Sequence, residues 1–137
     1  MTVEKDIVLW DDGGEKLSLF PVPDSHQYRY LENGPCVTFG IAYENENYKG
    51  RDIFTVFGSF YEDLLRAMKG AYRALTGSFR IADSAAETDG YVDFDLANGK
   101  LRINGQLGAS FWGYCLHFVM EADQTLVGAL LRSLAGQ

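Results

Sequence analysis

The sequence predicts an α+β fold, with mostly antiparallel strands in curved sheets of about eight strands, one central amphipathic helix and a C-terminal helix. One stretch, residues 59–77, carries apolar residues at helical spacing, whereas most of the remaining chain shows the alternation or the short apolar runs of strands. The connections between these strands are short, which favours antiparallel pairing. A single amphipathic helix among strands buries its stripe on a sheet. The 137 residues, 47% of them hydrophobic, suit one domain over residues 1–137.

The part of the chain before the central helix predicts strands separated by turns. The expected strands cover residues 7–10, 16–20, 27–31, 36–44 and 52–57. Asp11–Gly14 and Asn33–Pro35 supply turn residues, and the polar run Glu44–Asn47 predicts a hairpin loop. Pro21 and Pro23 have no N–H to donate to a ladder, so we expect the strand that follows them to lie near an edge.

The central helix is expected from Ser59 to Gly77. Ser59 and Glu62 match the S-x-x-E capping box, in which each side chain satisfies a backbone N–H of the first turn. Gly77 is placed to end the helix in the left-handed conformation. The spacing predicts one buried stripe made of Phe60, Leu64, Met68, Ala71, Tyr72 and Leu75.

The best hairpin signal in the chain lies after this helix, where Asn98-Gly99 separates two alternating runs. This dipeptide is typical of a type I′ turn, which fixes the register of the two strands. Leu96 is then expected to face Leu101, and Asp95 to face Arg102. The strands expected in this half cover residues 79–82, 91–97, 100–104 and 111–121, with a surface loop over 83–90.

The last strand and the closing helix complete the predicted fold. Alternation over 111–121 places five large side chains on one face, which we expect to be core: Trp112, Tyr114, Leu116, Phe118 and Met120. Asp123 is placed to cap a helix over 124–135 that ends at Gly136. Its buried positions are expected to be Leu126, Leu130 and Leu134.

The net charge limits the classes of partner that this protein is expected to bind. Nineteen acidic and twelve basic residues give a net charge of −7, which disfavours nucleic acid because phosphate binding needs a basic face. The excess favours a basic protein partner, or it serves solubility alone. The acidic residues expected to be exposed together, and to bind such a partner, are Glu44 and Glu46 in one loop, and Asp89, Asp93 and Asp95 around the other hairpin. Asp89, Asp93 and Asp95 could instead hold a hard cation or form a solvated face paired to Arg102, and no calcium-loop spacing accompanies them.

The cysteines and histidines do not predict a site. The spacing of Cys36, Cys115, His26 and His117 matches no zinc signature, because such signatures supply their ligands in closely spaced pairs. Cys115 and His117 lie two apart on a predicted strand, about 7 Å, which is too far for a nucleophile and its base. We expect both thiols to be buried. No phosphate-binding or nucleophile-elbow motif occurs, so no catalytic residue, metal or cofactor is predicted.

Three aromatic residues outside the helix leave two possibilities open. Trp10, Tyr28 and Tyr30 could form a recognition patch, or pack in the core. Residues 1–6 lack the features of a secretory signal, and no apolar run reaches about 18 residues, so a cytoplasmic location without membrane contact is expected.

Several segments resemble a known family. They are Phe60–Leu65, Gly90–Asp95, Leu101–Leu107 and Asp123–Leu126, within residues 36–135. Their order is similar to that in small bacterial domains of unknown function related to the WapI-type immunity proteins, which neutralise toxins of contact-dependent competition systems. The resemblance implies inhibition of a toxin by binding, and it implies no catalytic residues.

Two hypotheses about function follow. The first is a non-enzymatic binding protein of the immunity type, whose acidic surface meets a basic toxin. The alternative is a small-molecule-binding or enzymatic domain with a pocket between helix and sheet. A flat acidic patch with exposed aromatic residues favours the first, and convergent polar groups in a deep pocket favour the second. The sequence does not predict an oligomeric state.

Overall fold

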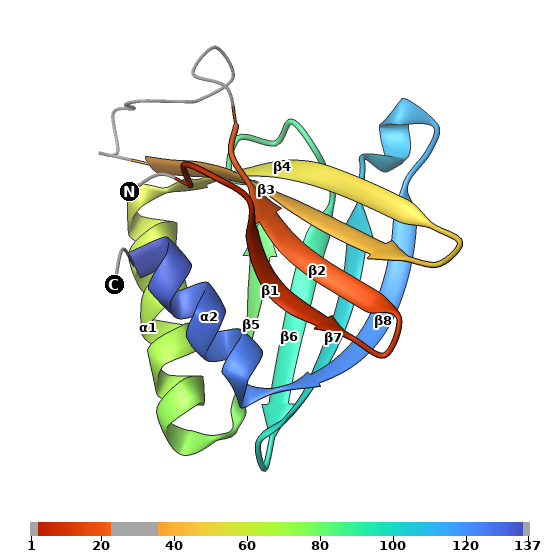
Figure 1. Ribbon diagram of the computed structural model, residues 1–137. Helices are drawn as coiled ribbons and strands as arrows, with labels where there is room; N and C mark the ends of the chain where they lie inside the picture. Colours follow the sequence, from red (N-terminus) through yellow and green to blue (C-terminus); the bar gives the residue numbers. More distant parts are fainter. Residues whose placement is uncertain (1–2, 23–35, 136–137) are drawn as a thin grey trace.

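The computed structural model describes residues 3–22 and 36–135, which form two four-stranded antiparallel sheets and two helices (Figure 1). The first sheet contains, in chain order, β1 (Ile7–Asp12), β2 (Glu15–Phe20), β3 (Cys36–Asn45) and β4 (Lys49–Phe57). The second contains, again in chain order, β5 (Gly77–Ala82), β6 (Tyr91–Ala97), β7 (Lys100–Leu107) and β8 (Leu116–Asp123). Helix α1 (Gly58–Ala74) connects the two sheets, and helix α2 (Gln124–Ala135) follows β8. The predicted α+β class is confirmed.

Three features predicted from the sequence lie outside the described residues. They are the strand at 27–31, the turn Asn33–Pro35 and the helix stop at Gly136.

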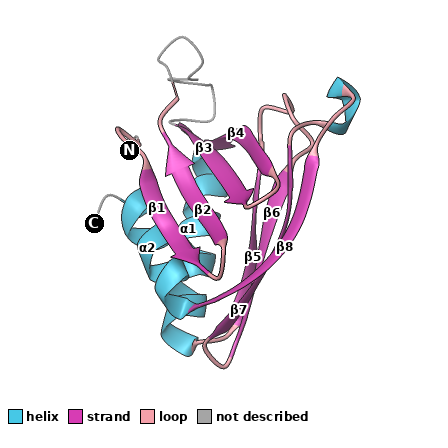
Figure 2. Ribbon diagram, turned by 45° about the vertical axis from the view of Figure 1, so that its right-hand side comes forward, coloured by secondary structure: helices cyan, strands magenta, loops and turns pink. Residues whose placement is uncertain are grey.

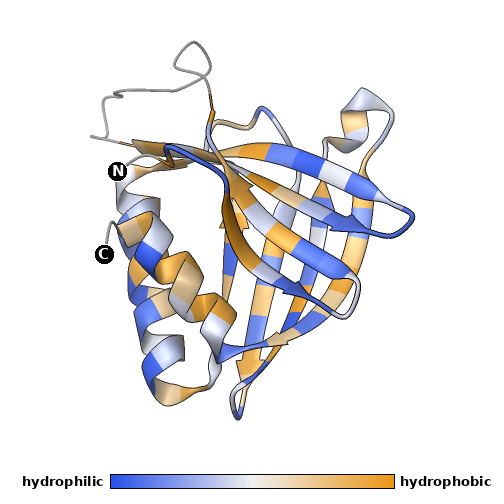
Figure 3. Cartoon of the chain, viewed as in Figure 1, coloured by the Kyte–Doolittle hydropathy of each residue, from blue (hydrophilic) through white to orange (hydrophobic). Residues whose placement is uncertain are grey.

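The hydrophobic core lies between the two sheets and the helix pair. Helices α1 and α2 pack side by side, α1 mainly against β5 and α2 against β1 and β8 (Figures 1 and 2). The Tyr61 hydroxyl on α1 donates a hydrogen bond to the backbone carbonyl of Leu134 on α2. Polar and apolar residues alternate along the strands, as Figure 3 shows, because successive side chains point to opposite faces of a sheet. The largest fully buried side chains are Phe39, Phe54 and Phe94.

The predicted hairpin around Asn98-Gly99 is confirmed. Both residues have positive φ, 54° and 79°, as a type I′ turn requires. Leu96 pairs with Leu101, and Asp95 pairs with Arg102, in the expected register. The apolar members of this hairpin are buried on its inner face. A local turn signal therefore determined the geometry of two strands of the second sheet.

The start of α1 differs from the prediction. The helix begins at Gly58, its cap residue Phe57 makes no side-chain capping bond, and Ser59 lies inside the first turn. The predicted capping box of Ser59 and Glu62 is therefore wrong, because a capping side chain must precede the first helical residue. The hydrogen bonds near this end come from the loop after β5. Asp83 Oδ1 accepts from the Thr55 N–H at 2.7 Å, and Ser84 Oγ accepts from the Phe57 N–H at 3.2 Å.

The end of α1 also differs. The left-handed residue is Leu75, with φ 58°, and Gly77 already belongs to β5. The Gly99 N–H donates to the Leu75 carbonyl at 3.0 Å, so the β6–β7 turn holds this helix end. Gly77 is needed for close approach instead, because a Cβ there would lie 3.1 Å from the Ala71 side chain at φ 141°.

The buried stripe of α1 is shorter than predicted. Leu64, Met68 and Ala71 are buried, as expected. Three other predicted members are exposed, by 60%, 39% and 43% respectively: Phe60, Tyr72 and Leu75. The helix extends beyond the core at both ends, so helical spacing alone overestimates the buried length.

The predicted strand over 111–121 is wrong in its first half. Ser110–Trp112 form a short 3₁₀ helix, η2, and β8 begins only at Leu116. Phe118 and Met120 are buried as expected, whereas Trp112 and Tyr114 are exposed.

The closing helix matches its prediction over the described residues. Asp123 Oδ1 accepts a hydrogen bond from the Thr125 N–H at 2.9 Å, which caps α2. The expected stripe is fully buried: Leu126, Leu130 and Leu134.

Candidate functional site

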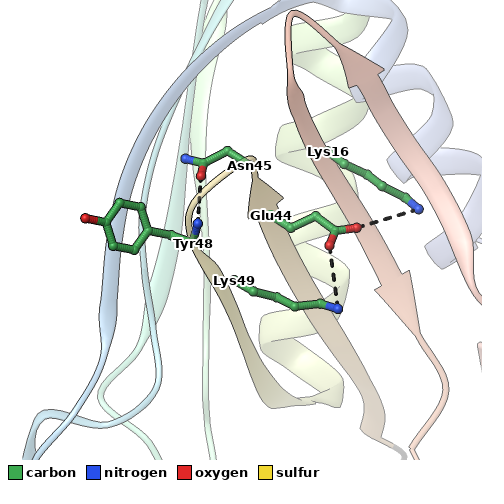
Figure 4. A network of polar contacts seen from close by, with 5 residues as sticks. All are labelled: Lys16, Glu44, Asn45, Tyr48 and Lys49. Carbon is green, nitrogen blue, oxygen red and sulfur yellow. Dashed lines mark hydrogen bonds and ion pairs between the residues drawn. The ribbon is translucent and has the colours of Figure 1, made fainter.

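The predicted acidic residues Glu44 and Glu46 lie in the β3–β4 hairpin. Glu44 lies near the end of β3, between Lys16 at 3.8 Å and Lys49 at 3.6 Å (Figure 4). Glu46 is exposed at the tip of the same hairpin. Asn45 Oδ1 accepts from the Tyr48 N–H at 2.9 Å and shapes this tip. The charge of Glu44 is therefore offset by two lysines, and Glu46 is the exposed carboxylate of the pair.

Asp93 and Asp95 lie on the outer face of the second sheet among basic residues. Both oxygens of Asp93 accept from Arg80, at 2.6 and 2.8 Å, and these bonds raise the pKa of the guanidinium. The Arg80 guanidinium also lies 4.5 Å from the centre of the Tyr91 ring. Asp95 faces Arg102 across the β6–β7 ladder. This face is thus a balanced mixture of charges.

Asp89 is exposed, and its carboxylate is hydrogen-bonded to other segments of the same chain. Its Oδ1 accepts from the Ser110 N–H at 2.8 Å and from Gln106 Nε2 at 3.1 Å, and its Oδ2 accepts from the Ser110 hydroxyl. The Ser110 hydrogen bonds hold the pKa of this carboxyl below its ordinary value. Asp89 consequently anchors the start of η2 to the loop that precedes β6.

The segment held by Asp89 carries three exposed aromatic side chains. Residues 110–114, here called the aromatic segment, project from the second sheet at the top right of Figure 1. Phe111, Trp112 and Tyr114 are 64%, 47% and 75% exposed. The Trp112 ring lies 6.1 Å from that of Phe111, edge to face, and 6.4 Å from that of Tyr114. These side chains form one continuous aromatic cluster outside the core.

A buried carboxylate holds the chain just before this segment. Asp52 on β4 is only 4% exposed, and its Oδ2 accepts from the Thr88 hydroxyl at 2.8 Å and from the Gly108 N–H at 2.9 Å. Burial raises the pKa of Asp52, although these hydrogen bonds oppose the shift. Gly90 leaves room for the carboxylate, because a Cβ there would lie 2.2 Å from Oδ2.

The role of Asp52 has no signature in the sequence. Thr88 and Gly108 follow it by 36 and 56 residues, so no local pattern connects them. An acidic residue that opens the apolar run 52–57 was the sole signal available.

The Cys115–His117 distance differs from the prediction. The two side chains approach to 3.6 Å between Sγ and Nε2, because Cys115 precedes β8 and is not bound by the spacing of a strand. Both cysteines, Cys36 included, are partly exposed rather than buried. Among the described residues no further hydrogen bond orients the His117 ring, so the pair lacks the third group of a catalytic triad.

The other residue types that could bind a metal or a partner are scattered or packed in the core over the described part of the chain. Within 3–22 and 36–135, no three Cys, His, Asp or Glu side chains are grouped to hold a metal ion. Trp10 packs against the core and is half-buried. Three further candidates lie outside the described residues: His26, Tyr28 and Tyr30.

A groove of about 510 Å³ lies where the alternative hypothesis expects one, between α1 and the second sheet. Its lining residues are Val56, Phe60, Asp63, Leu64, Ala67, Phe79, Arg80, Ala82, Asp83 and Ser84. The charged groups there already have partners. Arg80 is bound to Asp93, and the two oxygens of Asp83 accept backbone N–H groups of Thr55 and Glu87. The groove therefore favours binding over proton transfer.

The chain matches no protein-family model, no curated protein and no solved structure. In the described part of the chain, no helix has the length and apolar character needed to cross a membrane.

Proposed function

We propose that this chain is a non-enzymatic protein-binding domain whose partner docks on the aromatic segment. The observation that carries the proposal is the exposure of Phe111, Trp112 and Tyr114 on one short segment. Large aromatic side chains are enriched at protein interfaces and account for many of their energetic hot spots. Three such rings exposed to water contribute little to the stability of the fold, whereas a partner with an apolar pocket would remove their apolar surface from water.

The support beneath the aromatic segment favours this role. Asp89 holds Ser110 and Asp52 holds Gly108, so hydrogen bonds fix the chain at the start of the exposed cluster. A surface ordered before binding loses less conformational entropy when the partner docks. In this proposal Asp89 is a positioning residue, and its carboxylate does not meet the partner directly.

The net charge of −7 favours a basic partner. Opposite charge on two proteins accelerates their association, mainly through long-range attraction. Glu46 and Asp95 are exposed carboxylates that can contribute to this field, whereas Glu44 and Asp93 are already paired with basic side chains. The resemblance to WapI-type immunity proteins supports the same class of partner, a basic bacterial toxin.

The test compares capture of a partner from the native host by three forms of the protein. The double variant Trp112→Ala/Tyr114→Ala removes two rings of the aromatic segment. The matched control, Tyr48→Ala, removes a ring that is 64% exposed in the β3–β4 hairpin. We expect one protein to be retained equally by the wild type and the control, with about tenfold or greater loss of affinity for the double variant.

The contribution of charge to partner association is tested with the double variant Glu46→Lys/Asp95→Lys and by raising the salt concentration. Raising the salt from about 0.1 M to about 1 M shortens the Debye length from about 10 Å to about 3 Å. We expect slower association in both cases, with a smaller change in dissociation.

A partner that binds the double aromatic variant as tightly as the wild type would refute the proposal.

A further inference from the structure

Strand β5 is an edge strand of the second sheet. It pairs with β6 alone, and within the described residues no other hydrogen bond involves the backbone of residues 78–82. An antiparallel edge strand leaves alternate N–H and C=O groups unpaired, and these groups can accept another strand. Ser78, Arg80 and Ala82 are exposed.

The groove between α1 and β5 runs along this edge. The helix and the strand touch where they connect, at Ala71 and Gly77. Farther from this connection the groove opens, and it is lined by α1 from Phe60 to Ala67 and by β5 from Phe79 to Ala82. Val56 and Ser84 line its other end.

The helix side of the groove is an apolar stripe whose two ends, Phe60 and Ala67, are exposed, whereas Leu64 between them is buried in the core. Phe60, Leu64 and Ala67 follow helical spacing and line the groove together. Phe60 is 60% exposed, although helical spacing predicted it to be buried. On the sheet side, Phe79 is buried and stacks on Phe94 with 4.7 Å between ring centres, which makes that side firm.

We infer that this groove binds an extended peptide segment of a partner protein, which adds as a strand to the edge of β5. Backbone hydrogen bonds to β5 would supply affinity, and the apolar stripe of α1 would select side chains at alternate positions, as in other sites of strand addition. From Phe60 to Ala67 the helix rises about 10 Å. That length accommodates about three residues of an extended chain.

The charges around the groove specify the peptide further. Asp93 neutralises Arg80 through two hydrogen bonds. Asp63 is paired to Arg66, but both side chains are more than 70% exposed, so this ion pair contributes little and leaves the carboxylate accessible. Asp83 adds a second negative charge at the opposite wall. The preferred peptide therefore carries apolar residues at alternate positions and a Lys or Arg beside them.

This site is separate from the aromatic segment and does not depend on the function proposed for it. In Figure 1, α1 and η2 lie on opposite sides of the molecule. Failure of one proposal leaves the other intact, because each is tested by different variants.

The experiment starts with a phage-displayed library of linear eight-residue peptides selected on the intact protein. We expect enrichment of alternating apolar residues next to Lys or Arg. The best peptide is then synthesised with N-methyl groups on every second residue, in both possible sets. An N-methyl group removes a backbone donor, so one set is expected to weaken binding at least tenfold and the other less than threefold.

Protein variants locate the site. Ala67→Trp places a large side chain in the groove from an exposed position of α1. This variant is expected to lower the affinity for the peptide at least tenfold and to leave the circular dichroism spectrum unchanged. Tyr48→Ala, at a residue outside the groove, is the control and is expected to leave the affinity unchanged. Peptide-induced amide shifts in the NMR spectrum are expected at residues 78–82. The inference is overturned if no peptide is enriched, if both N-methylated sets bind equally, or if Ala67→Trp has no effect.

Discussion

The aromatic segment and strand β8 are separated by one residue, Cys115, and share one pattern, yet their large side chains lie in opposite environments. Trp112 and Tyr114 continue the alternation of Phe118 and Met120 without a break. The first two side chains are exposed, by 47% and 75%, and the last two are buried, at 6% and 2%. Alternation reports the two faces of a strand only where the backbone is part of a ladder.

The backbone at the start of the aromatic segment leaves the ladder because of hydrogen bonds from distant residues. Strand β7 ends at Leu107, and Gly108 turns the chain with φ 95°. Asp52 then binds the N–H of Gly108, and Asp89 binds the N–H of Ser110. These side chains replace strand pairing, and the ladder with β7 resumes only at Leu116.

The largest expected effect is a difference in the free energy of unfolding between a substitution in β8 and one in the aromatic segment. Phe118 is buried and stacks on Tyr43 at 4.3 Å between ring centres, so Phe118→Ala is expected to cost about 3–5 kcal/mol. Trp112→Ala is expected to stay within about 0.5 kcal/mol of the wild type. Urea denaturation measures both, and equal losses would show that the aromatic segment belongs to the core.

The next effect concerns the buried anchor. Asp52→Ala leaves the Thr88 hydroxyl and the Gly108 N–H without their acceptor, at an expected cost of roughly 1–3 kcal/mol. The exposed Asp95→Ala is the control, expected within about 0.5 kcal/mol. Urea denaturation midpoints of the two variants test this prediction. A midpoint for Asp52→Ala equal to that of the control would contradict an anchoring role.

Removal of the second anchor is expected to act locally. Asp89→Ala deletes the acceptor of the Ser110 N–H, so hydrogen exchange at that amide is expected to accelerate about tenfold. Exchange in β6 and β7 is expected to stay unchanged. Exchange measured by NMR tests this, with Asp93→Ala as control; uniform acceleration along the chain would indicate global destabilisation instead.

The smallest effect is a difference in pH dependence between the two anchors. Burial raises the folded-state pKa of Asp52, so its contribution to stability is present at low pH and is lost as the pH rises through the folded pKa. Hydrogen bonds from Ser110 lower the pKa of Asp89, so its contribution is present above the unfolded pKa and is lost as the pH falls through the folded pKa.

Asn variants isolate these two contributions. Between about pH 3 and pH 7, the stability of the wild type relative to Asp52→Asn is expected to fall with rising pH. Relative to Asp89→Asn it is expected to rise. Urea unfolding at each pH provides the measurement, and slopes of the same sign would contradict the assignment of one carboxylate to a buried and the other to an exposed environment.

Sequence alone determined the parts of this protein whose signals are local. The Asn98-Gly99 turn specified a register, and helical spacing identified Leu64 and Met68 as core and α2 as a closing helix. Short connections were enough to predict antiparallel pairing, because a tight turn brings neighbouring strands together in opposite directions.

Only the tertiary structure decided the features that depend on partners far along the chain. The region around the start of α1 is held by Asp83 and Ser84, which follow β5, and not by the predicted capping box. The groove along β5 exists because α1 and that strand diverge after their tight connection, leaving Phe60 outside the core. The chain just before the aromatic segment is held by Asp52, which accepts a hydrogen bond from Gly108, 56 residues farther along the chain. Periodicity describes which side chains share a face, whereas hydrogen bonds between distant segments determine whether that face is buried.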